Sequence, residues 1–132
     1  MNNNTLINGW NIMLFDKVES TMSEIKKYPK LVEKGNFGVL SEQQTLGVGR
    51  NGNTWISPIG NFYFSFVIEP NKNLRPSSLY ALLVGVAVCE ALQKISKNKI
   101  KPRIKWPNDI LVDNKKICGT LLESSLLGTK IQ

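Results

Sequence analysis

Histidine is absent from this sequence of 132 residues, and cysteine occurs only twice, at Cys89 and Cys118. The missing histidines exclude His-based catalytic triads, His general bases and His-ligated zinc sites. Two cysteines without CxxC spacing favour neither a metal cluster nor a disulfide scaffold, so we expect reduced thiols in a cytoplasmic protein. The most apolar stretch, residues 79–89, is too short to span a bilayer, and the first residues form no secretion signal. No membrane partner is therefore expected.

Length and composition predict one soluble globular domain, residues 1–132, with a core of its own. The net charge of +7 indicates either an anionic ligand or partner, or only good solubility. The charge is uneven, because the stretch from Lys94 to Lys116 holds eight basic residues and two acidic ones. A solvated basic surface is the competing interpretation of that stretch.

Hydrophobic periodicity predicts a mixed α+β domain with several antiparallel neighbours. The strands and short apolar pieces are expected at residues 12–18, 37–41, 61–68, 104–106, 110–112 and 117–124. The first ten residues read as a loose end or a strand lead-in. One helix is expected from Ser20 to about Pro29, with Thr21 and Glu24 at capping-box spacing. A second helix, residues 77–96, is apolar on nearly every side, which predicts deep burial.

The segment from Gln43 to Gly60 is rich in glycine, asparagine and proline, and residues 47–52 read GVGRNG, a GxGxxG pattern. A dinucleotide site is rejected because helix breakers follow the pattern, and no Gly-Lys-Ser/Thr of a Walker loop is present. Glycines still let backbone N–H groups approach an anion, and Arg50 adds a planar fork for carboxylate or phosphate. Trp55 offers a flat wall for a ring. A plain glycine turn with Trp55 in the core is the alternative.

A second polar cluster runs from Lys105 to Gly119. Two lysines on either side of a hairpin are placed to converge on a phosphate. Asp109 either neutralises a lysine or ligates Mg²⁺ shared with that phosphate. The alternative is a basic hairpin with ordinary surface ion pairs.

Three blocks of the sequence, in order, resemble one family. They are Ser20-Thr21-Met22, residues 42–58 (EQQTLGVGRNGNTWISP), and Lys105-Trp106-Pro107-Asn108-Asp109 followed by residues 115–119 (KKICG). The family is that of the biotin–protein ligases, or biotin–[acetyl-CoA-carboxylase] ligases. The resemblance implies an α+β fold with a mixed, largely antiparallel sheet and packed helices, related to class II aminoacyl-tRNA synthetases. It also implies that residues 1–132 are a catalytic domain without its C-terminal portion.

The resemblance further implies an ATP-dependent ligase. Biotin attacks the α-phosphate of Mg·ATP to give biotinyl-5′-AMP and pyrophosphate, and biotin then passes to a lysine of the biotin carboxyl carrier protein of acetyl-CoA carboxylase. No enzyme nucleophile is needed, which suits a chain without histidine, and the work is positioning and charge stabilisation.

Site residues follow from the same resemblance. Lys116 and Arg50 would be catalytic, with Lys116 on the carboxylate and α-phosphate oxygens. The biotin-binding set would be Ser20, Thr21, Met22, Gln44, Gly47, Val48, Gly49, Arg50, Trp55, Lys116 and Gly119. The ATP and phosphate set would be Arg50, Lys105, Asn108 and Asp109, with Asp109 also facing Mg²⁺.

Met22 and Val48 depart from the family pattern, which has Asn and Arg at these positions, so weaker ligand binding is expected. Other functions stay open: a non-catalytic biotin-binding or interaction protein on the same fold, and a basic nucleic-acid binder. A lipoate ligase shares the general fold, but the block at residues 105–109 favours biotin. No helix-turn-helix is visible, so no specific nucleic-acid partner is expected. The sequence leaves the oligomeric state open, a homodimer included.

Overall fold

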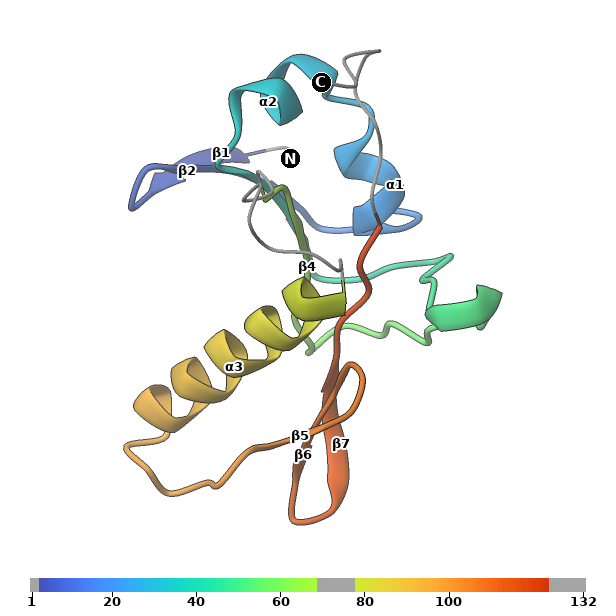
Figure 1. Cartoon of the computed structure of the whole chain (residues 1–132). Helices are drawn as coiled ribbons and strands as arrows, with labels where there is room; N and C mark the ends of the chain where they lie inside the picture. The colour runs from blue at the N-terminus through green and yellow to red at the C-terminus, as the bar shows by residue number, and fades with distance from the viewer. Residues whose placement is uncertain (1–2, 69–77, 124–132) are drawn as a thin grey trace. The chain divides into compact units, whose positions relative to one another are not determined.

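The computed structural model describes residues 3–68 and 78–123, which form two compact units, residues 1–70 and 71–132 (Figure 1). Helices and strands are mixed along the chain, and most neighbouring strands are antiparallel. The predicted α+β class is therefore confirmed.

The first unit is built on a four-stranded sheet in the spatial order β1-β2-β3-β4. Its strands are β1 (Asn3–Ile7), β2 (Trp10–Phe15), β3 (Phe37–Ser41) and β4 (Tyr63–Phe66). The pairs β1–β2 and β3–β4 are antiparallel, whereas β2 and β3 are parallel. Asn8 and Gly9, with φ of 49° and 81°, make the tight turn between the first two strands. Of the first ten residues, which were predicted to be a loose end or a strand lead-in, Asn3–Ile7 thus forms an edge strand.

Two short helices, α1 (Thr21–Ile25) and α2 (Pro29–Lys34), form the crossover that the parallel pair requires. The single helix expected here is divided because Pro29 begins a new helix at a position where its missing N–H costs nothing. The capping-box prediction is wrong. Ser20 is the N-cap, and its Oγ accepts a hydrogen bond from the backbone N–H of Met22 at 3.2 Å. With Ser20 as the N-cap, a capping box would need a carboxylate or amide side chain at residue 23, and Glu24 is the next residue. Its carboxylate forms an ion pair with Lys27, at 2.7 Å.

The core of the first unit lies between the sheet and these helices. Phe37 and Val39 of β3 are fully buried, and Ile25 of α1 is 6% exposed. Tyr28 packs edge-on against Phe37, with ring centroids 5.8 Å apart. Strand β3 lies in the middle of the sheet, so its continuous apolar run is buried.

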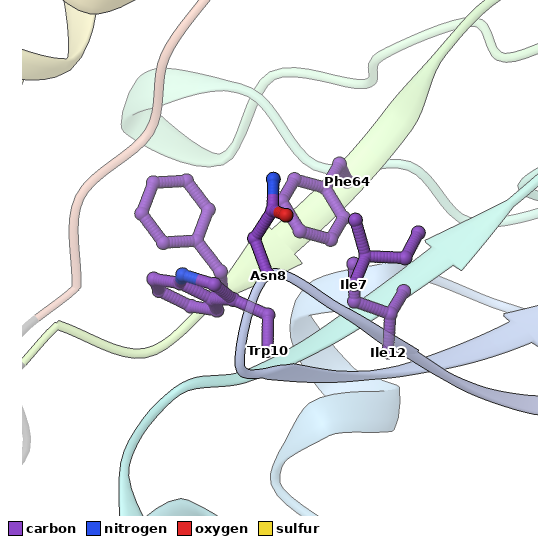
Figure 2. A pocket seen from close by; sticks show the side chains of 6 residues that line it. Ile7, Asn8, Trp10, Ile12 and Phe64 are labelled. Atoms are coloured by element: carbon purple, nitrogen blue, oxygen red, sulfur yellow. The ribbon is translucent and has the colours of Figure 1, made fainter.

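Strand β4 alternates as its sequence predicts. Tyr63 and Ser65 face the buried side of the sheet, and Phe64 and Phe66 point to the opposite side. There they line a shallow groove of about 310 Å³ together with residues of the β1–β2 hairpin (Figure 2). Trp10 packs edge-on against Phe66 in this groove, with ring centroids 5.7 Å apart.

The second unit joins one long helix, α3 (Ser78–Ile95), to a three-stranded antiparallel sheet. The strands are β5 (Arg103–Lys105), β6 (Asp109–Val112) and β7 (Lys115–Gly119). Asp113 and Asn114, with φ of 50° and 64°, form the predicted turn between β6 and β7. The apolar strand expected at 117–124 begins earlier and ends at Gly119; Ser124 lies outside the described residues.

The predicted deep burial of α3 is wrong. Among its described residues only Gly85 is buried, where it lies against Ile104 of β5, while Leu83 is 50% exposed and Val86 42% exposed. Three short strands cover one side of this 18-residue helix, and its other apolar positions have no cover from residues 78–123. In the part of the chain that the structure describes, no helix has the length and apolar character needed to cross a membrane.

Candidate functional site

The glycine-rich loop of the first unit has two arms held together by backbone hydrogen bonds. The N–H of Gln44 donates to the carbonyl of Ser57 (3.2 Å), and that of Trp55 donates to the carbonyl of Gly47 (2.8 Å). Between the arms, Arg50–Gly52 forms a single 3₁₀ turn. Residues 53–68, which follow the GxGxxG pattern directly, contain β4 and no α-helix, whereas a dinucleotide-binding fingerprint opens a helix.

Gly47 allows the two arms to approach closely. A Cβ atom at this position would lie 2.6 Å from Ser57 Oγ and 3.0 Å from Gln44 Nε2, and still closer to the carbonyl oxygen of Trp55. Real Cβ atoms do not make such contacts, so only glycine fits here. At Gly49 the nearest atom would be 3.4 Å away, which is far less restrictive.

A cluster of polar side chains lies beside this loop, and we call it the hydroxyl cluster: Thr21, Gln44, Ser57 and Ser65. Thr21 donates to Gln44 Oε1 from its backbone N–H (2.8 Å) and from its hydroxyl (3.1 Å), and the Thr21 and Ser65 hydroxyls lie 2.8 Å apart. Gln44 Nε2 donates to Ser57 Oγ at 2.9 Å. Thr21, Ser57 and Ser65 are each less than 9% exposed. Buried hydroxyls of this kind are stable only when hydrogen-bonded.

The sequence interpretation identified Thr21 and Gln44 but missed Ser57 and Ser65. Ser65 carried a signal, because it shares a face of β4 with Tyr63 and a small polar residue on a buried face is unusual. Ser57 lay within the family-like block at residues 42–58, but nothing in its spacing predicted a partner for its hydroxyl.

The remaining predicted residues of the first unit are placed around the cluster. Ser20 caps α1 with its hydroxyl, and the adjacent Met22 is half-buried. Val48 is 50% exposed and Arg50 is exposed at the tip of the loop. Trp55 is half-buried, so it is not the core residue that the alternative interpretation of the loop required.

In the second unit, Lys116 and Asp109 form an ion pair, with 2.7 Å between Nζ and Oδ1. A β-bulge makes this possible. Leu111 pairs with Lys116 and the preceding residue pairs with Cys118, so Ile117 is an extra residue on β7. Regular alternation would put Lys116 on the face of Cys118. The bulge instead puts it on the face of Leu111 and Asp109.

The strand register gathers charged residues on the face of this sheet that is turned away from Ile104 and α3. The residues that share this face are Arg103, Lys105, Asp109, Leu111, Lys116 and Gly119. Three cations thus share a face with one carboxylate. Lys116 contacts that carboxylate directly, whereas Arg103 donates to Asn114 Oδ1 at 2.7 Å. A predominantly cationic face of this kind is suited to a phosphate chain. The predicted residues Lys105, Asp109, Lys116 and Gly119 are brought together here.

Asn108 lies in the turn between β5 and β6 and is tied to the end of β7. Its Nδ2 donates to the carbonyl of Thr120 (2.8 Å), and the Thr120 N–H donates back to the carbonyl of Asn108 (2.9 Å). The side chain of Asn108 therefore fastens the turn after Lys105 to the end of β7, next to Asp109.

The residues of this face do not make a metal site by themselves. Across residues 3–68 and 78–123 no group of three His, Cys, Asp or Glu side chains is placed to hold a metal ion. Asp109 is a single carboxylate, already paired with Lys116. Mg²⁺ usually binds through one or two carboxylates together with substrate phosphates. A Mg²⁺ ion at this face would thus need ligands from outside the protein.

The thiol of Cys118 is expected to react slowly with alkylating reagents. Burial, supported by the nearby Cys89, raises the pKa of Cys118, and the charge of Lys116 opposes this only in part. A raised pKa leaves less thiolate at neutral pH, and the thiolate is the reactive form. Iodoacetamide at pH 7.5 should therefore alkylate Cys118 more slowly than glutathione, with a rate that keeps rising as the pH approaches the raised pKa. Peptide mass mapping over time measures this, and a rate above that of glutathione would contradict it.

Arg50 and Lys116 belong to different units. Their joint catalytic role, implied by the family resemblance, stays a prediction. Within the units, the structure joins Thr21 with Gln44 and joins Lys116 with Asp109.

Comparison with known proteins identifies the family of the chain. The Biotin/lipoate A/B protein ligase family matches residues 14–132. The biotin–[acetyl-CoA-carboxylase] ligase of Paracoccus denitrificans is 34% identical over 117 residues, covering 88% of this chain and 48% of that protein. The biotin–protein ligase of Homo sapiens is 39% identical over 95 residues, covering 68% of this chain and 13% of that protein.

Solved structures give the same result. The biotin protein ligase from Aquifex aeolicus in complex with biotin and ATP has a TM-score of 0.76 and 33% identity, covering 86% of this chain and 47% of that one. The biotin acetyl coenzyme A carboxylase synthetase from Helicobacter pylori with bound biotinylated ATP has a TM-score of 0.74 and 26% identity, covering 86% and 55%. The chain thus spans about half the length of the Paracoccus protein and of the two solved structures, and much less of the human protein. With the match over residues 14–132, it belongs to the biotin/lipoate A/B protein ligase family.

Proposed function

We propose that this chain binds biotin and ATP and contributes to a biotin–protein ligase active site, which makes biotinyl-5′-AMP and passes biotin to a lysine of a carrier domain. The observation that carries this proposal is the hydroxyl cluster beside the glycine loop. Relatives of the same family, solved in complex with biotin and ATP, support it.

The hydroxyl cluster suits the ureido head of biotin. A cyclic urea presents N–H donors and a carbonyl acceptor side by side, and the cluster presents hydroxyl and amide groups at short distances from one another. Because the hydroxyls are buried, hydrogen bonds to them are not weakened by competing water. The indole of Trp55, half-buried on the second arm of the loop, would cover the apolar part of the ligand.

The cationic face of the second unit suits the phosphates. In the first step, a biotin carboxylate oxygen forms a bond to the α-phosphorus of ATP while the bond to the bridging oxygen breaks, and pyrophosphate leaves with the electron pair. Negative charge grows on the α-phosphate oxygens and on the leaving group. Lys116 would stabilise this charge, and its pairing with Asp109 holds the ammonium in place beforehand. Lys105 and Arg50 would bind the remaining phosphate oxygens.

Turnover is the test of this proposal. The chain is mixed with biotin, Mg·ATP and a biotin carboxyl carrier domain, and pyrophosphate and biotinylated carrier are measured. Release of pyrophosphate that depends on biotin is expected. Biotin binding without pyrophosphate would favour the second candidate, a non-catalytic biotin-binding protein on the same fold, and absence of biotin binding would contradict both.

Biotin binding is expected to be weaker than about 1 μM. Val48 and Met22 replace residues that could each add a polar or charged contact, and both are accessible enough to face a ligand. Isothermal titration calorimetry with biotin measures this. A submicromolar dissociation constant together with tight retention of the adenylate would refute the expectation.

A further inference from the structure

The hydrogen bonds of the hydroxyl cluster run in one direction. A hydroxyl has a single proton, and that of Thr21 is donated to Gln44 Oε1. The contact of 2.8 Å between Thr21 and Ser65 must therefore be donated by Ser65. Gln44 Nε2 then donates to Ser57 Oγ (2.9 Å), and Ser57 donates to the carbonyl oxygen of Trp55 (2.9 Å). The chain of donors starts at Ser65 and ends on the backbone of the second arm of the loop.

This direction decides what Gln44 can offer to a ligand. Its Oε1 already accepts two hydrogen bonds, from the N–H and the hydroxyl of Thr21, so both lone pairs are used. One N–H of the amide goes to Ser57. The second N–H has no partner among residues 3–68 and 78–123. Gln44 can therefore give a ligand one hydrogen-bond donor and no further acceptor.

Ser57 fixes the NH₂ end of the Gln44 side chain, which carries the remaining N–H donor. Ser57 is 4% exposed, and its hydroxyl proton is donated to the Trp55 carbonyl, so the lone pairs of the hydroxyl are left for Gln44. Gln44 and Ser57 are also joined through the backbone, at 3.2 Å. Without the hydroxyl, Thr21 would hold only the Oε1 end of the amide, and the NH₂ end would be left without its buried acceptor.

We propose that Ser57 is a positioning residue, whose hydroxyl holds the Gln44 amide so that its second N–H faces an acceptor oxygen of the bound biotin head, the ureido carbonyl. The proposal rests on the proposed function, because it needs biotin in this cluster. It adds that selectivity for a carbonyl at the head of the ligand is set by a residue that does not itself touch the ligand.

The test compares biotin with 2-iminobiotin, in which a protonated imino nitrogen replaces the ureido oxygen at neutral pH and cannot accept a hydrogen bond. Ser57→Ala should weaken biotin binding roughly tenfold, the usual size for a hydrogen bond lost in a buried site. It should leave the affinity for 2-iminobiotin nearly unchanged, so the ratio of the two affinities should fall roughly tenfold. Isothermal titration calorimetry of the full chain, by displacement for the weaker ligand, gives both values.

Ser41→Ala is the matched control. Ser41 is 2% exposed, and its hydroxyl likewise donates to a backbone carbonyl, that of Gln43, at 2.8 Å. Because Ser41 does not touch Gln44, this variant should keep the wild-type ratio of affinities. Melting temperatures by circular dichroism show whether the two variants lose comparable stability.

A second pair of variants distinguishes the effect of the Ser57 hydroxyl from the effect of side-chain packing at this position. Ser57→Thr and Ser57→Val add side chains of the same shape, and only the first keeps the hydroxyl. The threonine variant should keep the selectivity for biotin, and the valine variant should lose it.

Three results would overturn the inference: equal losses for both ligands in Ser57→Ala, no loss for either, or equal selectivity in the threonine and valine variants. Wild-type chain that binds neither ligand would instead overturn the proposed function, and with it this inference.

Discussion

Replacing Lys116 with alanine is expected to slow the formation of biotinyl-5′-AMP about 100-fold to 1,000-fold, the usual cost of removing one preorganised charge contact from a transition state. Lys116 lies on the bulged strand β7 beside Asp109, on the cationic face of the second unit. Its ammonium would meet the negative charge that develops on the α-phosphate oxygens. Pyrophosphate release at saturating biotin and ATP measures the rate.

Lys115→Ala is the control for this prediction. Lys115 precedes Lys116 on the same strand and is equally cationic, but it pairs with Val112 and thus faces the other side of the sheet. Its loss should change the rate no more than a few-fold. Circular dichroism must show that both variants are folded, because Lys116→Ala leaves the Asp109 carboxylate without this partner. An unchanged rate in a folded Lys116→Ala chain would remove Lys116 from the mechanism.

Replacing Gly47 with alanine is expected to weaken biotin binding about 100-fold, because separating the arms would leave buried polar groups unpaired at about 1–3 kcal/mol each. The new Cβ would lie 2.6 Å from Ser57 Oγ and closer still to the Trp55 carbonyl, so the two arms of the loop must separate. This separation would break the hydrogen bond from Trp55 to Gly47 and move Gln44 relative to Ser57. Calorimetric titration with biotin measures the effect, and the melting temperature should also fall.

Gly49→Ala provides the steric comparison. Its Cβ would lie 3.4 Å from the nearest atom, an oxygen of Asn53, so the loop can keep its shape. The melting temperature of this variant should stay close to that of the wild type. If Gly47→Ala melts like Gly49→Ala and binds biotin equally well, close approach of the arms is not what Gly47 provides.

Short sequence patterns predicted many strands and turns of each unit, because these elements depend on residues that are near each other in the sequence. The buried run Phe37–Ser41 and the alternation after Asn61 gave β3 and β4, and the Asp113-Asn114 pair gave the turn between β6 and β7. These features depend on side-chain period and on residues that tolerate positive φ. The deep burial expected for α3 failed, since burial depends on what covers a helix and not on its composition alone.

The candidate sites were predicted by residue type but not by geometry. Thr21 and Gln44 were named from the family resemblance, yet their direct contact spans 23 positions of sequence and became visible only in the fold. The pairing of Lys116 with Asp109 was one of two roles left open for that carboxylate. It depends on a bulge at Ile117, and one extra residue in a strand reverses which face a side chain takes.

The three tryptophans occupy different surroundings, which makes the chain a convenient optical reporter. Trp10 packs against Phe66 in the groove of the first unit, Trp106 is 66% exposed, and Trp55 lies on the second arm of the glycine loop. Changing Trp10 and Trp106 to phenylalanine would leave a single indole in the loop. The intrinsic fluorescence of that chain would then follow the loop alone, so its motion on addition of a ligand can be timed by stopped flow without any attached dye.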